Sequence, residues 1–144
     1  MFKINNMDTH HISSAFTHGM SFKAAVNRHT VITDTTVDGG GNDEGPSPKR
    51  LMLVSLAGCT GIDVVSILNK MKVEFSDLSI DVSASLTEEH PKIYKEVKIK
   101  YSIKLADADR PKMEKAVKLS EEKYCGVSAM FRAFAKVEHE VVYL

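Results

Sequence analysis

Residues 51–65, LMLVSLAGCTGIDVV, carry a single charge, Asp63, in fifteen positions. Ser47 and Pro48 precede this stretch and predict a helix start, because a serine hydroxyl caps free backbone amides and proline suits the first helical position. A helix from about residue 47 to 71 has apolar residues on every side: Leu51, Leu53, Val54, Leu56, Ile62, Val64, Val65, Ile67 and Leu68. A helix without a polar face needs cover all round, so we expect it to be the buried centre of the fold.

The other predicted elements of the chain can bury only part of this helix. Residues 73–105 predict an antiparallel hairpin, because apolar and polar residues alternate along two long segments joined by a turn. Residues 109–135 predict helices, the first of them amphipathic. One small sheet and one amphipathic helix leave part of the central helix uncovered. We therefore expect a homodimer, in which a partner subunit completes the cover.

The remaining segments complete an α+β pattern. Residues from about 10 to 36 predict short strands, residues 38–48 (DGGGNDEGPSP) a flexible loop, and residues 136–143 a final strand. A chain of 144 residues with 43% hydrophobic and 26% charged residues has the size and composition of one globular domain. We predict a single α+β domain over residues 1–144, with antiparallel sheets around the central helix.

Composition argues against several classes of partner. The 19 basic residues balance the 19 acidic ones, so no net positive charge would attract nucleic acid or anionic lipid. The apolar run at residues 51–65 is short for a bilayer span and contains Asp63 and two glycines, which favours a core helix over a membrane segment. The first residues do not resemble an export signal. We expect a cytoplasmic protein without a membrane or nucleic-acid partner.

The chain has two cysteines, Cys59 and Cys125. Neither belongs to a closely spaced ligand pair, so the spacing does not predict a metal site. A structural disulfide is also disfavoured in a reducing cytoplasm. Free cysteine is among the most buried residue types, so both thiols can be core filler. Redox chemistry is the alternative, and the spacing of the two residues leaves both readings open.

Redox chemistry needs a thiolate, which is favoured by a nearby cation or by a helix N-terminus. Cys59 lies about three turns into the predicted helix, beyond the reach of the helix dipole. Asp63 follows it by one turn, and its charge would disfavour the thiolate unless a basic residue pairs with it. The candidate cations are Arg28, Lys49, Arg50 or a basic residue of the other subunit.

Two segments carry a family resemblance. GPSPKRLMLVSLAGCTGIDVV (residues 45–65) and LSEEKYCGVSAMF (residues 119–131), separated by two long strands, resemble the two cysteine motifs of the OsmC/Ohr family of organic-hydroperoxide-reducing proteins. The resemblance covers the chain from about Ser14 onward. The GCTGID version of the first motif resembles the redox-protein branch of the family, and Lys49 stands where the peroxidase branch has a glutamate.

The resemblance implies an intertwined homodimer that reduces organic hydroperoxides in oxidative-stress defence. Cys59 would be the peroxidatic thiol and become a sulfenic acid, and Cys125 would be the resolving thiol that condenses with it to a disulfide. A dithiol reductant such as a lipoylated protein would reduce that disulfide, and no cofactor is implied. The alternatives are a protein of the same fold that binds a small hydrophobic ligand without catalysis, or a redox sensor.

Overall fold

The computed structural model describes residues 8–144. Contacts between residues divide the chain into two compact units, the first ending at Leu51 and the second starting at Met52. The first unit contains three strands, β1 (Ser13–His18), β2 (Ser21–Val26) and β3 (His29–Thr33), which form an antiparallel sheet in that order. These strands lie within the segment for which alternation predicts them.

The segment after β3 is a loop, as its composition predicts, and a buried carboxylate holds it through hydrogen bonds. A short 3-10 helix, η1 (Val37–Gly39), opens it. The carboxylate of Asp34, 3% exposed, accepts hydrogen bonds from the backbone N–H groups of Thr35 (2.7 Å), Asn42 (3.2 Å) and Glu44 (3.1 Å). Gly41 permits this packing, since a Cβ there would lie 2.3 Å from the Thr35 carbonyl oxygen. A buried carboxylate, rather than apolar burial, fixes this loop.

The second unit contains a three-stranded sheet in the order β4-β5-β6. β4 (Phe75–Leu86) and β5 (Tyr94–Leu105) form the predicted antiparallel hairpin. β6 (Lys136–Tyr143) pairs with β5 in parallel, which corrects the expectation of antiparallel sheets only. A parallel pair needs a long crossover, and the helical residues between β5 and β6 supply it. The mixed α+β class is confirmed.

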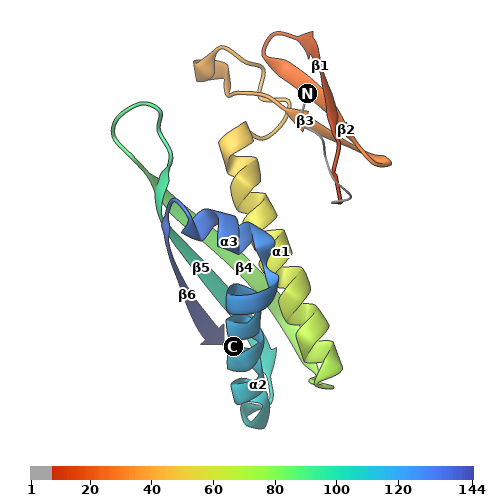
Figure 1. Cartoon of the computed structure of the whole chain (residues 1–144), viewed down its shortest axis with the longest axis vertical. Coiled ribbons are helices and arrows are strands. Elements are labelled where there is room, and N and C mark those ends of the chain that lie inside the picture. The colour runs from red at the N-terminus through yellow and green to blue at the C-terminus, as the bar shows by residue number, and fades with distance from the viewer. Residues whose placement is uncertain (1–7) are drawn as a thin grey trace. The chain divides into compact units, whose positions relative to one another are not determined.

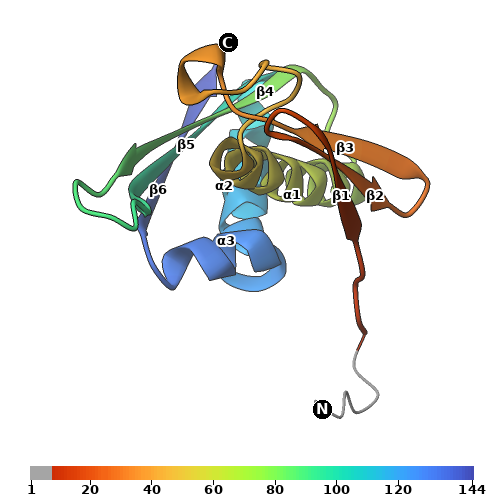
Figure 2. The ribbon, with the colours of Figure 1, turned by 90° about the horizontal axis from the view of Figure 1, so that it is seen from above.

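The crossover contains a short 3-10 turn, η2 (Asp107–Asp109), then α2 (Arg110–Leu119), a π-helical turn η3 (Ser120–Tyr124) and α3 (Gly126–Arg132). Figures 1 and 2 show α2, α3 and the long helix α1 on one face of the β4-β5-β6 sheet. The core lies between these two layers and is formed mainly by β5, α1 and α2. Its largest fully buried side chains include Tyr101, Phe131, Leu56, Leu68, Ile99, Ile103 and Met113.

The long helix α1 spans Pro48–Lys70, close to the prediction. The N–H of Leu51 donates to the carbonyl of Ser47, as expected if Ser47 begins the helix. Gly61 lets α1 approach β4, because a Cβ on Gly61 would lie 2.9 Å from Cδ1 of Ile80. The helix therefore packs against the sheet at the motif that contains Cys59.

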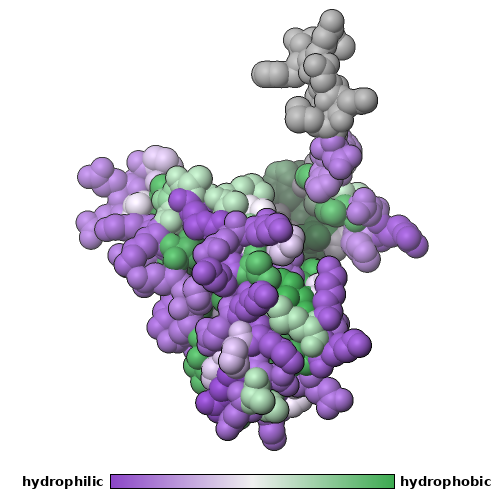
Figure 3. Space-filling view, turned by 60° about the horizontal axis from the view of Figure 1, so that its bottom comes forward, coloured by the Kyte–Doolittle hydropathy of each residue, from purple (hydrophilic) through white to green (hydrophobic). Residues whose placement is uncertain are grey.

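One face of α1 is buried in the chain and another is exposed. Leu56, Val64 and Leu68 are 0% exposed, whereas Val54 and Ile62 are 61% and 73% exposed. Figure 3 shows apolar side chains, in green, at the surface of the face that it draws. The chain alone thus does not give this apolar helix the all-round burial that its sequence predicts.

The 23 residues of α1 are also long and apolar enough to cross a membrane by length and composition. The expectation that the apolar stretch is too short to span a bilayer therefore does not hold for the whole helix. A core helix of a soluble protein passes the same test. In this chain Leu56, Val64 and Leu68 are fully buried against the other elements of the second unit, and 28% of the most apolar window of α1 is buried.

Candidate thiol site

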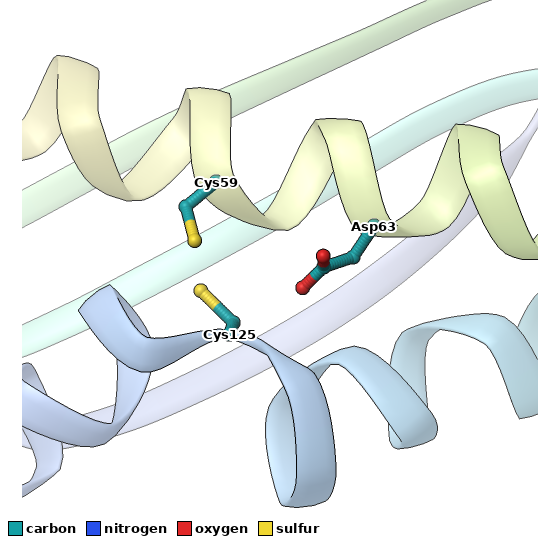
Figure 4. Close-up of side chains that lie close together, drawn as sticks. All are labelled: Cys59, Asp63 and Cys125. Atoms are coloured by element: carbon teal, nitrogen blue, oxygen red, sulfur yellow. The ribbon is translucent and has the colours of Figure 1, made fainter. Parts of the chain in front are cut away.

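The structure brings Cys59 and Cys125 together from distant parts of the sequence. Cys59 lies in the middle of α1, and Cys125 lies at the junction between η3 and α3. The Sγ atoms of both cysteines and a carboxylate oxygen of Asp63 all lie within 4.8 Å of one another. Figure 4 shows the two thiols and the carboxylate pointing into the same space between α1 and the crossover. Both cysteines are free thiols.

Helix geometry fixes two members of this cluster. Cys59 and Asp63 are four residues apart on α1, so both side chains lie on one face, one turn apart. The hydroxyl of Ser120 donates to Oδ2 of Asp63 at 3.0 Å. Ser120 is 0% exposed, so the hydrogen-bond partner of Asp63 is a buried hydroxyl group.

The π-helical turn positions Cys125. The N–H of Cys125 donates to the carbonyl of Ser120 at 2.7 Å and closes the turn, after which Cys125 adopts an extended conformation. Cys125 is then the N-cap of α3, and its Sγ accepts a hydrogen bond of 3.2 Å from the N–H of Ser128. π-helical turns occur frequently at functional sites. Here the turn directs both Ser120 and Cys125 toward α1.

The two thiols differ in their surroundings. Cys125 is 3% exposed, and burial raises the pKa of its thiol to about 11, with a hydrogen bond to Cys59 adding to the increase and the Ser128 N–H opposing it. Cys125 is thus a neutral thiol near pH 7. Cys59 is only partly buried. An external oxidant or alkylating reagent therefore has better access to Cys59.

A buried tyrosine lies near the cluster. Tyr101 is 0% exposed, and its hydroxyl has no hydrogen-bond partner among the described residues. Burial raises its pKa to about 12; the neighbouring Thr60 hydroxyl opposes this increase, and the charges of Glu121 and Asp63 add to it. Thr60 adjoins it but donates its hydroxyl proton to carbonyl oxygens of its own helix. Tyr101 is therefore a protonated, neutral neighbour of the site.

The cations that the sequence offers lie elsewhere in the chain. Lys49 and Arg50 precede Cys59 by about ten residues on α1, or about 15 Å along the helix axis, beyond the ~6 Å over which an opposite charge shifts a pKa. Arg28 lies in the turn between β2 and β3, in the first unit. A cation that the sequence did not indicate is Arg132, whose Nη1 donates to the hydroxyl of Ser128 at 2.7 Å.

A cavity of about 300 Å³ adjoins Asp63. Apolar side chains line most of it, and Lys70 adds one positive charge. Its lining residues are Asp63, Ser66, Ile67, Lys70, Met71, Leu119 and Tyr124. A small molecule with an apolar part could lie there, beside the carboxylate of the thiol cluster.

The cysteine-containing segments match a known family. The sequence profile described as OsmC-like protein matches residues 40–140. The chain belongs to the OsmC family. Protein YhfA of Escherichia coli (strain K12) is 32% identical over 103 residues, which are 72% of this chain and 77% of YhfA.

Solved structures share the OsmC fold. A hypothetical protein from Aquifex aeolicus VF5 is 32% identical, with a TM-score of 0.79, and the match covers 96% of this chain and 99% of that one. An organic hydroperoxide resistance protein from Elizabethkingia anophelis is 15% identical with a TM-score of 0.69, over 98% of this chain and 100% of that one. At that identity the second likeness shows the fold alone.

Sequence reasoning did not identify Ser120, Tyr101 or Arg132. Asp63 was detectable because it lies one helical turn after Cys59. Ser120 was not, because its hydrogen bond to Asp63 joins residues 57 positions apart and depends on the π-helical turn.

Proposed function

We propose that this OsmC-family protein reduces organic hydroperoxides, with Cys59 as the attacking thiol and Cys125 as the resolving thiol. The observation that most supports this proposal is the approach of two free thiols and a carboxylate to within 4.8 Å. Two sulfurs so close can form a disulfide with a small rearrangement of side chains. The fold is shared with a protein named for organic hydroperoxide resistance.

The difference between the thiols assigns their roles. The attacking thiol must meet an external peroxide, and Cys59 is the more exposed of the two. Cys125 is buried, and its raised pKa of about 11 keeps its proton on sulfur near neutral pH. A buried neutral thiol is protected from direct oxidation and suits the later, intramolecular step.

In the first step, the Cys59 thiolate attacks the terminal oxygen of the hydroperoxide. An S–O bond forms, the O–O bond breaks, and the alkoxide leaves and takes up a proton to become the alcohol. Asp63 is the proposed proton carrier, because its carboxylate lies beside both sulfurs. It accepts the proton of the Cys59 thiol and returns it to the leaving alkoxide.

In the second step, the Cys125 sulfur attacks the sulfur of the sulfenic acid on Cys59. An S–S bond forms, and the sulfenic oxygen leaves as water with the proton of Cys125. A dithiol, such as that of a lipoylated protein, then reduces the disulfide by exchange and becomes a disulfide itself. The cycle uses no cofactor and fits a cytoplasmic protein, since reduced dithiols are maintained there.

The proposal includes a homodimer. The exposed apolar side chains of α1, among them Val54 and Ile62, are the surface that a second copy would cover. Light scattering is expected to give twice the chain mass of 15.9 kDa. Exchange of Ile62 for Glu places a charge at that surface and should shift the protein toward monomer, whereas Glu at the exposed position Val37 should not.

The test of catalysis uses cumene hydroperoxide and a dithiol with the wild type and both cysteine variants. We expect Cys59→Ser to lower peroxide consumption to the rate of the dithiol alone, a loss on the order of 10³-fold or more. Cys125→Ser should react once and accumulate a sulfenic acid on Cys59, detectable with a dimedone-type reagent. A wild type no faster than the free dithiol would contradict the proposal.

The cavity beside Asp63 favours a second candidate function, the binding of a small hydrophobic molecule without catalysis. This candidate gains support if the wild type lacks turnover yet binds an apolar fluorescent probe at one per chain. Exchange of Leu119, a lining residue, for Gln should then weaken binding.

A further inference from the structure

The thiol cluster is also a set of metal ligands. We propose that the reduced protein binds one thiophilic cation of the Zn²⁺ type through Sγ of Cys59, Sγ of Cys125 and a carboxylate oxygen of Asp63. The three atoms lie within 4.8 Å of one another. Sequence spacing argued against a metal site because the ligands are not adjacent in the chain, but the crossover brings Cys125 to the α1 face that carries the other two.

The distances suit a tetrahedral ion. Zn–S bonds of ~2.3 Å and a Zn–O bond of ~2.1 Å place the ligand atoms ~3.5–3.8 Å apart, so each ligand pair needs to close by at most about 1.3 Å. Rotation of three side chains can supply that movement. Three protein ligands leave the fourth position for solvent or an external thiol, the arrangement of an open zinc site.

The ligand chemistry selects the class of cation. Two sulfurs and one oxygen favour Zn²⁺ and other soft or borderline ions, while Ca²⁺ and Mg²⁺ require mainly oxygen ligands. Cys59 and Asp63 are held on one face of a long helix, which limits the side-chain entropy lost on binding.

Two of the three ligands are oriented by hydrogen bonds from neighbouring residues. The Ser120 hydroxyl donates to Oδ2 of Asp63 at 3.0 Å and leaves the other carboxylate oxygen for a cation. The N–H of Ser128 donates to Sγ of Cys125 at 3.2 Å and stabilises negative charge on that sulfur. Such partners commonly change metal affinity by 10–100-fold when they are removed.

Binding is a proton exchange without oxidation. The thiol groups of Cys59 and Cys125 release their protons to solvent, and two S–Zn bonds form with the resulting thiolates. While the ion is bound, the same sulfurs cannot form a disulfide. Oxidation to the disulfide would release the ion, so metal binding and thiol oxidation exclude each other. The inference depends on the ligand geometry and not on the proposed peroxidase activity.

The test is a Zn²⁺ titration of the fully reduced protein without oxygen or peroxide, in competition with a chromophoric chelator. We expect one ion per chain and release of protons on binding. Cys59→Ser and Cys125→Ser should each weaken binding by about 100-fold or more, Asp63→Asn by at least about tenfold and Ser120→Ala by about tenfold. Asp81→Asn, an exposed carboxylate on β4, is the matched control and should bind as the wild type does.

Circular dichroism and the free thiol count identify any variant that fails to fold. Wild type that cannot compete with the chelator would overturn the inference. Wild-type affinity in Asp63→Asn would also overturn it, because the two thiols alone would then explain binding. A Cys59→Ser or Cys125→Ser variant that retains the ion would overturn it as well. Peroxide is absent throughout, so this outcome is independent of the assay for hydroperoxide reduction.

Discussion

Asp34 and Asp63 are two aspartates with different surroundings, one in each compact unit. Asp34 is 3% exposed, and both of its oxygens accept hydrogen bonds from three backbone N–H groups. Asp63 is partly buried beside two sulfurs, and within residues 8–144 the hydroxyl of Ser120 donates to it. The carboxylate of Asp34 is fully used by the fold, whereas one oxygen of Asp63 remains available.

The difference separates a structural acid from a candidate functional one. The hydrogen bonds to Asp34, with that of the Glu44 N–H the largest contribution, hold its pKa below the ordinary value. A saturated carboxylate of this kind is a poor proton carrier near neutral pH. In Asp63 the Ser120 hydroxyl donates to Oδ2, which leaves Oδ1 for proton transfer or metal binding. The comparison predicts that substitution of Asp63 lowers hydroperoxide turnover, whereas substitution of Asp34 loosens the loop after β3.

The largest effect is expected for Asp63→Asn on hydroperoxide reduction. An amide cannot carry the proton, so turnover should fall by about 100-fold while the melting temperature changes little. Peroxide consumption with a dithiol measures the first quantity, and thermal unfolding the second. Asp81→Asn serves as the control. Unchanged turnover in Asp63→Asn would show that Asp63 is no proton carrier.

Asp34→Ala should produce the opposite pattern. Three backbone N–H groups lose their acceptor, so residues 35–47 should open more often, with protease cleavage there about tenfold faster. Reactivity of Cys59 toward an alkylating reagent should stay the same. A fall in hydroperoxide turnover equal to that expected for Asp63→Asn would break the distinction between the two aspartates.

The pH dependence of the loop follows from the lowered pKa of Asp34. A folded-state pKa below the ordinary value of 3.8 means that ionised Asp34 contributes stability above that value, which is lost as pH falls through the folded-state pKa. Amide exchange at Asn42 and Glu44, corrected for intrinsic rates, should therefore accelerate from about pH 5 to pH 2. Asp34→Asn should lack this acceleration.

The smallest effect is expected at Tyr101. Its buried hydroxyl lacks a hydrogen-bond partner in the described chain, so Tyr101→Phe removes an unsatisfied polar group without opening a cavity. The free energy of unfolding should change by less than about 1 kcal/mol or rise slightly. Chemical denaturation measures it. A tenfold fall in turnover would instead assign Tyr101 to the chemistry.

Local patterns in the sequence predicted most elements. The alternation in residues 73–105 predicted β4 and β5, and the Ser47-Pro48 start predicted α1. Strand direction was not predictable for β6, since alternation is the same in parallel and antiparallel strands. The glycine-rich composition after β3 predicted a loop, but it did not indicate that the carboxylate of Asp34 holds that loop.

Local sequence patterns also predicted part of the thiol site. The two cysteine motifs identified Cys59 and Cys125, and the helical spacing placed Asp63 one turn after Cys59. Whether the two sulfurs meet depends on where the crossover returns to α1. Ser120 enters the site only because the π-helical turn redirects the chain before Cys125.

The sequence by itself determined the elements, the family and the two thiols, because periodicity and motif are properties of neighbouring residues. The tertiary structure alone decided which polar groups surround each thiol and each aspartate. Those contacts join residues far apart in the chain, so they depend on the path of the backbone between them. The open carboxylate of Asp63 beside two sulfurs is the feature that only the folded chain creates.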